Sequence, residues 1–181
     1  MNTETYYDKL LRSRRSCRKF TKEVPPSELV DKVVMAGLLA PTGRGRQSSV
    51  VVRIDDPDLK ARITAVNAKI MGAPPSPDRG PDPFYAAPVM LLVIADKSNN
   101  TAVYDGSLAL GYMMLKAEEL GLASCWIHRA KEEMEGELGK EILERLGLEG
   151  EWEGVGHLAL GYAAVPPPPQ KPLRPGRYLS L

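Results

Sequence analysis

The chain has 181 residues, 43% of them hydrophobic, and a formal net charge of +1 at pH 7. That length and apolar content predict one compact domain, and the near-neutral charge gives no electrostatic reason to expect nucleic acid or an anionic membrane as a partner. The only cysteines and histidines, Cys17, Cys125, His128 and His157, lack metal-ligand spacing, so we expect no metal site.

The first residues and the apolar runs bear on localisation. Residues 1–5 are polar and lack the apolar core of a signal peptide. The longest apolar run, from Val89 to Ala95, has the length of a strand rather than that of a membrane span. We therefore expect a cytoplasmic protein that does not enter a membrane.

The N-terminal third of the chain predicts two helices and a strand. We expect a short helix over residues 5–11 and a second helix over 27–38, with Ser27 as its N-cap and an apolar stripe along one side. Pro41 ends the second helix, because its ring removes a hydrogen-bond donor. The loop 42–47 then leads to residues 50–54, whose β-branched side chains predict a strand.

The middle of the chain predicts a buried helix. A helix over 58–69 and a proline-rich surface loop over 72–83 precede an expected strand over 89–95. Asp105 is then expected to cap a helix that runs to Leu120 and is apolar on almost every side. In a chain this short, burial on every side usually needs a partner subunit.

The C-terminal third predicts two strands around a charged helix. Residues 124–127 and 157–161 are the expected strands, and the helix between them carries apolar residues at four-residue steps: Met134, Leu138, Ile142 and Leu146. The tail from Val165 contains four consecutive prolines and should lie across a surface as an extended arm. Helices and strands without strict alternation predict an α+β fold.

Two loops have a composition that suits an anionic ligand. Residues 14–20 combine arginines with a serine, and guanidinium groups and a hydroxyl suit a phosphate, although the segment is also consistent with a solvated basic turn. The glycine-bearing loop 40–47 does not match a dinucleotide fingerprint, which needs a strand before its glycines and a helix after them. It is either a flexible connection or a loop whose backbone amides reach a ligand.

No side chain predicts acid–base or nucleophilic catalysis. Cys125 lies in an apolar strand without an adjacent base, so we interpret it as a small apolar residue rather than a nucleophile. His128 lacks a paired carboxylate motif, and His157 is interpreted as a core or edge histidine. The residues alone predict a dimer-prone domain with separate anion-binding loops, and they do not name a reaction.

Taken in order, these segments resemble the nitroreductase family. Arg14–Arg18 is similar to the family's Arg-x-Ser-x-Arg/Lys signature, and Ala40–Gln47 is similar to its loop Ala/Ser-Pro-Ser-x-x-Asn-x-Gln. Four further segments follow in the family's order: Ala87-Pro88 before a strand, a central helix from Asp105 to its end at Leu120-Gly121-Leu122, the strand Ser124–Ile127, and Leu160-Gly161-Tyr162 before a basic tail. The resemblance covers nearly the whole chain.

The resemblance implies both a fold and an activity. The fold is α+β, a nitroreductase-like α/β/α sandwich with a mixed, mostly antiparallel sheet, in an intertwined homodimer with FMN at the interface. Residues 1–164 would form the single FMN-binding domain, and residues 165–181 an extended C-terminal arm. The implied activity is an FMN-dependent oxidoreductase that transfers electrons from NADH or NADPH to a small-molecule acceptor such as a nitroaromatic or a quinone.

The resemblance also assigns cofactor-binding residues. The FMN phosphate or the pyrimidine edge would be held by Arg14, Arg15, Ser16 and Arg18, and Lys171 and Arg174 of the tail would approach the phosphate. The other subunit would contribute Pro41, Thr42 and Gly43, and Gln47 of the same loop is assigned to the cofactor site too. The ring would be lined by Trp126, Ile127, His128 and Arg129, with a backbone amide near His128 or Arg129 facing N5. No catalytic side chain is expected, because the flavin carries the chemistry.

Departures from the family pattern leave two other functions open. Gly45 stands where the family often has Asn, and Ser48-Ser49 replaces a common Pro-Trp, so the acceptor side of the pocket is altered. The same fold could support another flavin reaction, such as reductive dehalogenation or flavin fragmentation. The protein could also be a non-enzymatic flavin carrier, if the altered loop has removed the acceptor site. The sequence does not choose between NADH and NADPH.

Overall fold

The structure is a computed structural model that describes residues 4–72 and 82–181. The surface loop expected over 72–83 lies almost entirely outside these ranges. In chain order the elements are α1 (Tyr6–Ser13), α2 (Ser27–Leu38), the short 3-10 helix η1 (Gly43–Gly45), β1 (Ser49–Ile54), α3 (Pro57–Met71), β2 (Val89–Asp96), α4 (Ala102–Glu119), β3 (Ala123–Ile127), α5 (Ala130–Met134), α6 (Glu137–Leu146) and β4 (Trp152–Gly161).

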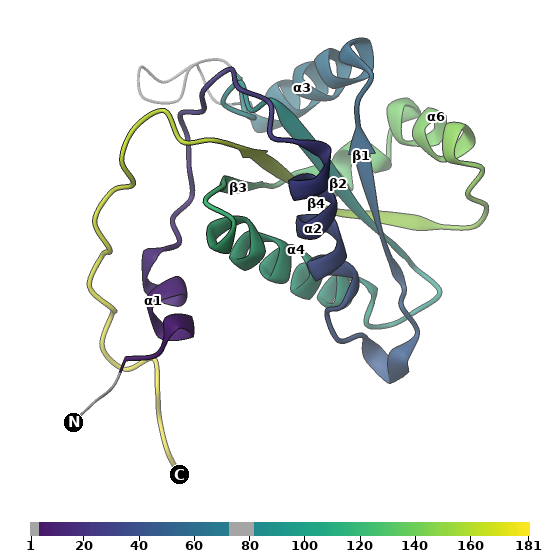
Figure 1. The fold of residues 1–181 in the computed structure, drawn as a ribbon. Coiled ribbons are helices and arrows are strands. Elements are labelled where there is room, and N and C mark those ends of the chain that lie inside the picture. Colours follow the sequence, from purple (N-terminus) through teal and green to yellow (C-terminus); the bar gives the residue numbers. More distant parts are fainter. Residues whose placement is uncertain (1–3, 73–81) are drawn as a thin grey trace.

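The four strands form one sheet in the order β1-β2-β4-β3 (Figure 1). All three pairings between neighbouring strands are antiparallel, and one isolated parallel bridge adds Ser16 beside Ser124 of β3. The expected α+β fold with a mostly antiparallel sheet is therefore confirmed.

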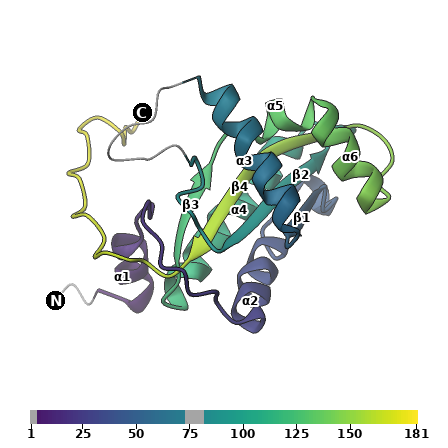
Figure 2. The same cartoon turned by 90° about the horizontal axis from the view of Figure 1, so that it is seen from above.

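The sheet is the middle of three layers. Helices α3, α5 and α6 cover one face, and α2 and α4 cover the other (Figures 1 and 2). Strand β2 shows why its apolar run is continuous. Its Met90, Leu92 and Ile94 pack into the core under α3, α5 and α6, whereas Leu91 and Val93 pack into the core under α2 and α4. A strand buried on both faces has no side chain left for solvent, because successive side chains point to opposite faces.

Two expected helix starts are wrong. Ser27 is the first residue of α2 rather than its N-cap, and Pro26 takes the cap position without a side-chain hydrogen bond. Helix α4 begins at Ala102, one turn before Asp105, so Asp105 is an interior residue of the helix. A carboxylate in the first turn of a helix resembles a cap in sequence, and only its hydrogen-bond partners separate the two roles.

Two C-terminal elements also differ from expectation. The charged helix is interrupted, and α5 and α6 meet at Gly136, whose backbone is extended. Strand β4 begins at Trp152, five residues before the expected start at His157. Its early part contains Gly154, where a Cβ atom would lie 2.0 Å from the carbonyl oxygen of Ala130. The close approach of α5 requires a glycine there, and glycine is depleted in strands, which hides the strand from sequence patterns.

The chain runs past α1 after leaving the sheet. Ala163 forms an isolated antiparallel bridge with Phe20, and the backbone N–H of Ala164 donates to the carbonyl oxygen of Lys19 at 2.8 Å. Residues 165–181 then extend past α1 as an exposed segment without helix or strand (Figures 1 and 2). Among the helices of the described ranges, none combines the length and the apolar character needed to cross a membrane.

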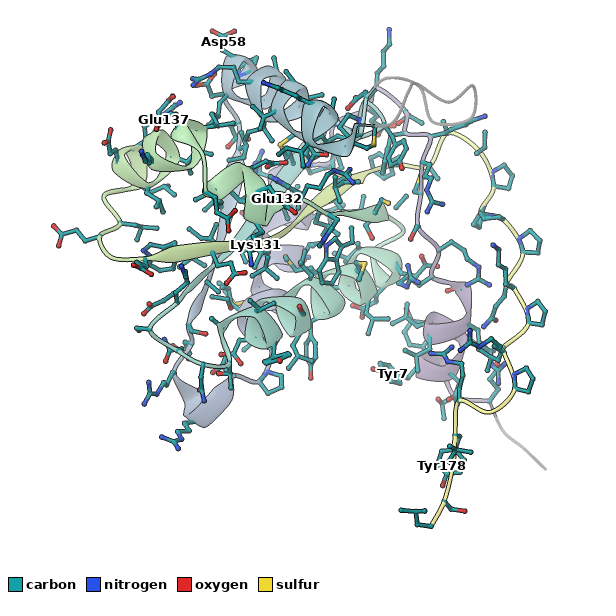
Figure 3. The ribbon with its side chains drawn as sticks, turned by 180° about the vertical axis from the view of Figure 1, so that it is seen from behind. Tyr7, Asp58, Lys131, Glu132, Glu137 and Tyr178 are labelled. Carbon is teal, nitrogen blue, oxygen red and sulfur yellow. The ribbon has the colours of Figure 1, made fainter. Side chains whose placement is uncertain are left out.

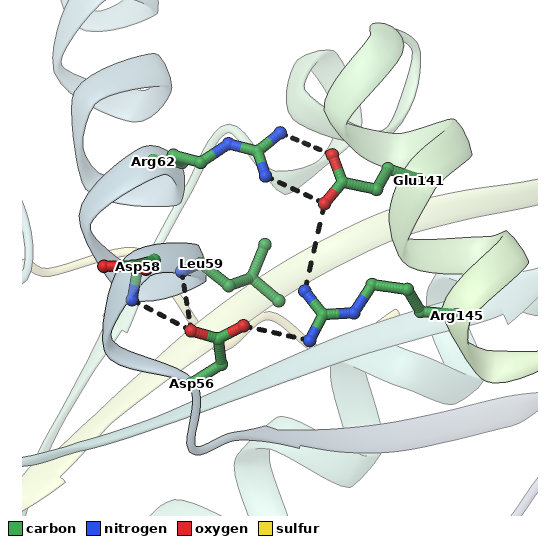
Figure 4. Close-up of polar contacts among 6 residues, drawn as sticks. All are labelled: Asp56, Asp58, Leu59, Arg62, Glu141 and Arg145. Carbon is green, nitrogen blue, oxygen red and sulfur yellow. Dashed lines mark hydrogen bonds and ion pairs between the residues drawn. The ribbon is translucent and has the colours of Figure 1, made fainter.

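An ion-pair network joins the start of α3 to α6 (Figure 4). Asp56 accepts from the backbone N–H groups of Asp58 and Leu59 at 2.9 and 3.3 Å and thereby caps α3. Its second oxygen accepts from Arg145 at 2.9 Å, and Arg62 forms a two-bond pair with Glu141, which also lies near Arg145. The network therefore ties two helices of one layer together.

We expect Asp56→Asn to lower the melting temperature slightly and Asp56→Ala to lower it more, since asparagine still caps a helix but carries no charge. The hydrogen bond from Arg145 holds the pKa of Asp56 below its usual range. The ion pair therefore stabilises the fold above the unfolded-state pKa of about 3.9, and this contribution is lost as the pH falls through the lowered folded-state pKa.

Thermal unfolding from pH 7 down to pH 3 checks this expectation. The difference between the wild type and Asp56→Asn should shrink below about pH 4. In an Arg145→Gln background, Asp56→Asn should have no further effect at pH 7. An equal effect of Asp56→Asn in both backgrounds would contradict the ion pair.

Candidate functional site

The segment after α1 runs beside β3. Helix α1 ends at Ser13, and Arg14 follows it as the C-cap with a backbone that has left the helical conformation. Ser16 then pairs with Ser124 in a parallel bridge, and the backbone N–H of Cys17 donates to the carbonyl oxygen of Ser124 at 2.9 Å. This isolated bridge places the basic segment of the sequence against β3, an edge strand of the sheet.

Three of the expected phosphate-binding residues gather around Cys125 of β3. Burial raises the pKa of the Cys125 thiol, and the nearby positive charges of Arg18 and Arg14, with a hydrogen bond to Ser16, only partly oppose this effect. The thiol is therefore not activated, in agreement with its interpretation as an apolar residue. The side chains of Arg14 and Arg18 donate no hydrogen bond to another residue in the described ranges, so both remain available to a ligand.

Arg15 is used differently from its neighbours. Its Nη1 donates to the carbonyl oxygens of Arg12 and Arg14 at 2.6 and 2.7 Å. These bonds satisfy backbone acceptors at the end of α1, where a helix leaves carbonyl groups without partners. The Nε of Arg15 is buried and lacks a partner among the described residues. The Arg15 guanidinium is therefore hydrogen-bonded to the end of α1. The guanidinium groups of Arg14 and Arg18 have no such partner among the described residues.

A cavity of about 360 Å³ opens beside this segment. Its walls are residues 15–19, Leu122 and Ala123 at the start of β3, Glu118 in α4, and residues 165–168 of the tail. Cationic side chains on one side and an apolar wall on the other suit an anion attached to an apolar group. Lys171 and Arg174, farther along the tail, are exposed and do not line this cavity.

The turn after β3 is held by hydrogen bonds from α3. Trp126 is half-buried and Ile127 buried, whereas His128 is exposed. Arg129 has a φ of +80°, a left-handed conformation that costs a non-glycine residue free energy. Asn67 of α3 holds this turn: its Nδ2 donates to the carbonyl oxygen of His128 at 2.9 Å, and its Oδ1 accepts from the Nε of Arg129 at 2.9 Å.

Asp105 holds the loop after α2, a role that the sequence did not reveal. Its carboxylate accepts from the backbone N–H of Gly43 at 3.0 Å and from the hydroxyls of Ser48 and Thr101 at 2.6 and 3.2 Å. Burial raises the pKa of Asp105, but these three bonds outweigh burial and leave the pKa below its usual value. Asp105 is the one charged residue in the stretch 102–115 of α4, and this isolation was the available signal of a buried partner.

The same loop needs a glycine and a tight turn. A Cβ atom on Gly43 would lie 2.2 Å from the hydroxyl oxygen of Thr101. Gln47 has a positive φ of 51°, and its backbone N–H donates to the Thr42 hydroxyl at 3.0 Å, while its side chain is exposed. Pro41 is exposed at the entrance of the loop. The loop is therefore an ordered element with backbone and side-chain groups facing outward.

Within one chain the two halves of the expected site lie far apart. The loop after α2 contacts Asp105 near the start of α4, whereas the cavity beside Arg18 contacts Glu118 near the end of α4. The stretch of helix between those two residues is about 20 Å long at 1.5 Å per residue. Figure 1 shows η1 and α1 near opposite ends of α4. A single chain does not bring both halves to one ligand.

An apolar surface of α4 remains uncovered between these two halves. Val103, Tyr104, Leu108 and Tyr112 are exposed large hydrophobic residues, and the last three repeat at four-residue spacing. The stripe continues into a groove that α4 shares with Tyr6, Tyr7 and Leu10 of α1. Figure 3 shows Tyr7 on the side of α1 that faces α4. The helix expected to be buried on every side is thus buried on one side only within the chain.

Comparisons with known proteins identify the family and the fold. The sequence model described as the Nitroreductase family matches residues 11–162. A nitroreductase with bound FMN from Bacteroides fragilis superposes with a TM-score of 0.84 over 98% of this chain and 99% of that chain, at 21% identity. An FMN-bound nitroreductase from Desulfitobacterium hafniense superposes with a TM-score of 0.83 over 96% of each chain, at 25% identity.

Curated relatives align over shorter stretches. Iodotyrosine deiodinase of Thermotoga neapolitana is 31% identical over 132 residues, which are 65% of this chain and 70% of that protein. An NADPH-dependent oxidoreductase of Staphylococcus epidermidis is 34% identical over 64 residues, 35% of this chain. The alignments with this oxidoreductase and with iodotyrosine deiodinase 1 of Rattus norvegicus span only 26% and 23% of those proteins.

Proposed function

Because this chain belongs to the nitroreductase family, we propose that it is an FMN-dependent oxidoreductase that takes electrons from NADH or NADPH and passes them to a small-molecule acceptor such as a nitroaromatic or a quinone. The observation that carries the proposal is the pair of uncommitted guanidinium groups, Arg14 and Arg18, whose positive charges, together with the Ser16 hydroxyl, act on Cys125 of β3. FMN-bound structural neighbours and the NADPH-dependent relative support the cofactor and the donor.

The residues present fit FMN. Two guanidinium groups and a hydroxyl are a donor set that suits a phosphate ester, and Ser16 and Arg18 line a cavity with an apolar wall. Bound FMN would supply the hydride and electron chemistry. Arg14, Ser16 and Arg18 would bind its phosphate or pyrimidine edge, and the exposed backbone at His128 would lie toward its ring. Trp126 and Ile127 would support that backbone from β3.

The protein would work as a homodimer whose site is completed by the partner. The loop with Pro41, Thr42, Gly43 and Gln47 is too far from Arg18 in one chain, so the copy from the second subunit would supply it. The exposed apolar stripe on α4 would be the centre of the interface. Residues 165–181 would act as the arm, bringing Lys171 and Arg174 to a phosphate when the dimer forms.

The chain's own residues supply binding and electrostatics rather than proton transfer. The positive charges of Arg14 and Arg18 favour an anionic cofactor and any negative charge that develops on it. Burial keeps Cys125 as a thiol, and the exposed His128 imidazole makes no hydrogen bond with another described residue. No side-chain acid or base is then required for electron transfer.

Isolation of the protein tests this function directly. We expect a yellow protein that releases FMN on denaturation and oxidises NADH or NADPH when menadione or nitrofurazone is supplied. Colourless protein that fails to bind added FMN would overturn the proposal. Bound FMN without NADH or NADPH oxidation would leave the carrier interpretation as the correct one.

A second candidate function, reductive dehalogenation, is favoured by one observation. The relative from Thermotoga neapolitana is an iodotyrosine deiodinase that aligns over 65% of this chain. The two functions differ in their acceptor, so iodide release from 3-iodotyrosine by the dithionite-reduced protein separates them. We expect release far slower than the reduction of a quinone, and the opposite ratio would favour the deiodinase function.

We expect Cys125→Ala to keep FMN and most of the NADH or NADPH oxidation, with a loss of stability of about 1 kcal/mol from a small packing defect. The reason is that burial raises the pKa of this thiol, whereas a nucleophile needs a lowered one. Flavin content, turnover and melting temperature measured beside the wild type check this. If turnover collapses in folded, flavin-loaded Cys125→Ala, the thiol takes part in the chemistry.

A further inference from the structure

A line of buried polar residues crosses the layer of α3 and α5 and ends at the turn after β3. His157 of β4, Glu133 of α5 and Asn67 of α3 are 1%, 3% and 0% exposed. None of the three is needed for the binding roles described above, and they come from separate parts of the chain. Buried polar groups of this kind are costly unless they are fully paired.

The hydrogen bonds connect these residues in one direction. His157 Nε2 and Glu133 Oε2 are 2.5 Å apart, and Glu133 Oε1 accepts from Asn67 Nδ2. The second hydrogen on Asn67 Nδ2 goes to the carbonyl oxygen of His128, and Asn67 Oδ1 accepts from Arg129. Both ends of the Asn67 amide are therefore hydrogen-bonded. Its orientation is fixed, because acceptors surround its nitrogen and a donor faces its oxygen.

The side-chain amide of Asn67 lies between the positive charge of Arg129 and the negative charge of Glu133. Arg129 donates to the oxygen end of Asn67, and Glu133 accepts from the nitrogen end, so the amide dipole lies favourably between a guanidinium and a carboxylate. His157 satisfies the second carboxylate oxygen and packs its ring edge-to-face on Phe84, with ring centres 5.1 Å apart. The Nδ1 of His157 has no partner among the described residues, which is an unusual cost for a group retained only for packing.

The turn that these hydrogen bonds restrain contains a residue with strained backbone, Arg129. Arg129 has the left-handed φ of +80° and is followed at once by α5, a helix of only five residues. A left-handed arginine persists only where its surroundings over-determine it. Asn67 bonds to the backbone before this residue and to its side chain, and Glu133, one turn into α5, bonds to Asn67. The turn is thus clamped on both sides.

We propose that Asn67, anchored by Glu133 and His157, is a positioning residue that holds the His128–Arg129 backbone in the conformation that meets the flavin. This rests on the proposed function only in naming the flavin as what the turn meets. Replacing Asn67 by leucine, which has a similar volume and no polar atom, should release the turn. The clamp itself can be measured in the protein without cofactor.

The control for Asn67→Leu is Ile63→Ala. Ile63 lies one turn earlier on α3 and is equally buried, but it packs in the apolar core and has no polar atom with which to bond to the turn. Hydrogen exchange of the cofactor-free proteins should show at least tenfold faster exchange of the amides of residues 128–130 in Asn67→Leu. Ile63→Ala should raise exchange throughout the α3 layer without singling out the turn. In the FMN-loaded proteins, only Asn67→Leu should shift the midpoint potential of the flavin and weaken FMN binding at least tenfold.

The outcomes are separable. If Asn67→Leu and Ile63→Ala give the same exchange pattern, the polar line is structural and the proposal is overturned, whatever happens to FMN. If the wild type binds no FMN, the proposed function fails, and hydrogen exchange alone still decides whether Asn67 clamps the turn. If Asn67→Leu does not fold, Arg129→Ala replaces it, because Arg129 is only half-buried and the change removes the bond to Asn67 Oδ1. Unchanged exchange at residues 128–130 in Arg129→Ala would overturn the proposal.

Discussion

Replacing Arg14 and Arg18 together with alanine should weaken FMN binding at least tenfold. Charge-assisted hydrogen bonds contribute about 1.5–3 kcal/mol each, and even the lower value for two such bonds exceeds a tenfold change after a discount for the exposure of Arg18. Both guanidinium groups lie near Ser16 and Cys125, and neither is committed to another described residue. Titration of the cofactor-free variant with FMN, followed by fluorescence quenching, measures the change.

A charge-matched control distinguishes direct binding of FMN by these two arginines from the general electrostatic effect of the protein's positive charge. Arg12 and Lys22 lie close by in sequence, are exposed and do not line the cavity, and among the described residues Arg12 forms an ion pair with Glu4 at the surface. The Arg12→Ala/Lys22→Ala variant removes the same two charges and should bind FMN within about threefold of the wild type, since exposed charges at a distance are screened by salt. Equal losses in both double variants would remove the phosphate assignment.

Leu108→Arg should convert the protein from a dimer to a monomer and remove most of its FMN. Leu108 is 45% exposed in the middle of the apolar stripe on α4, between Tyr104 and Tyr112. If this stripe is the centre of an interface larger than the standard size of roughly 1,600 Å², two buried arginines would face each other across the symmetry axis or lose their hydration. The loop with Gly43 would then no longer reach the site that contains Arg18.

The matched control is Leu146→Arg on the opposite layer. Leu146 is 41% exposed at the end of α6, so the same substitution introduces the same charge at nearly the same exposure. Sedimentation at micromolar concentration with absorbance detection of the flavin should give a yellow dimer for the wild type and for Leu146→Arg. A flavin-loaded monomer for the wild type would contradict both the interface on α4 and the shared site. A monomeric Leu108→Arg variant with full flavin would contradict only the shared site.

The two tests act on different halves of the same site. Arg18 lines the cavity at one end of α4, and the Gly43 loop lies about 20 Å away at the other end. Loss of FMN in the arginine variant without dissociation, together with loss of FMN in the Leu108 variant through dissociation, would indicate that two subunits meet at one flavin.

Local patterns in the sequence predicted the order of the elements, since each pattern depends on near neighbours. The apolar run of β2 and the stripe of α2 appear where they were expected, because burial of a strand or of a helix face is written in the spacing of apolar residues. The boundaries of the elements were predicted less accurately. Asp105 was predicted to be a helix cap but lies inside α4, and the glycines at the start of β4 led us to predict a strand that begins five residues too late.

Residue type was enough to predict which segment binds an anion. It was not enough to predict which of the arginines in that segment are free to do so. Arginines and a serine in one segment predict a phosphate site wherever the segment lies, and the segment does lie beside β3. That Arg15 turns back to the end of α1 while Arg14 and Arg18 stay open depends on how the helix ends. Sequence spacing does not determine that direction.

The resemblance of the ordered motifs identified the family and, with it, the layered sandwich, whereas composition and periodicities of a few residues predicted an α+β fold and the segments that carry charge. The tertiary structure alone decided that Asp105 holds Gly43 and that Asn67 holds Arg129. Each of these pairs is separated by 62 residues. A hydrogen bond requires donor and acceptor within a few tenths of an ångström of ideal distance. Only the packing of helices against the sheet brings such distant groups to that precision.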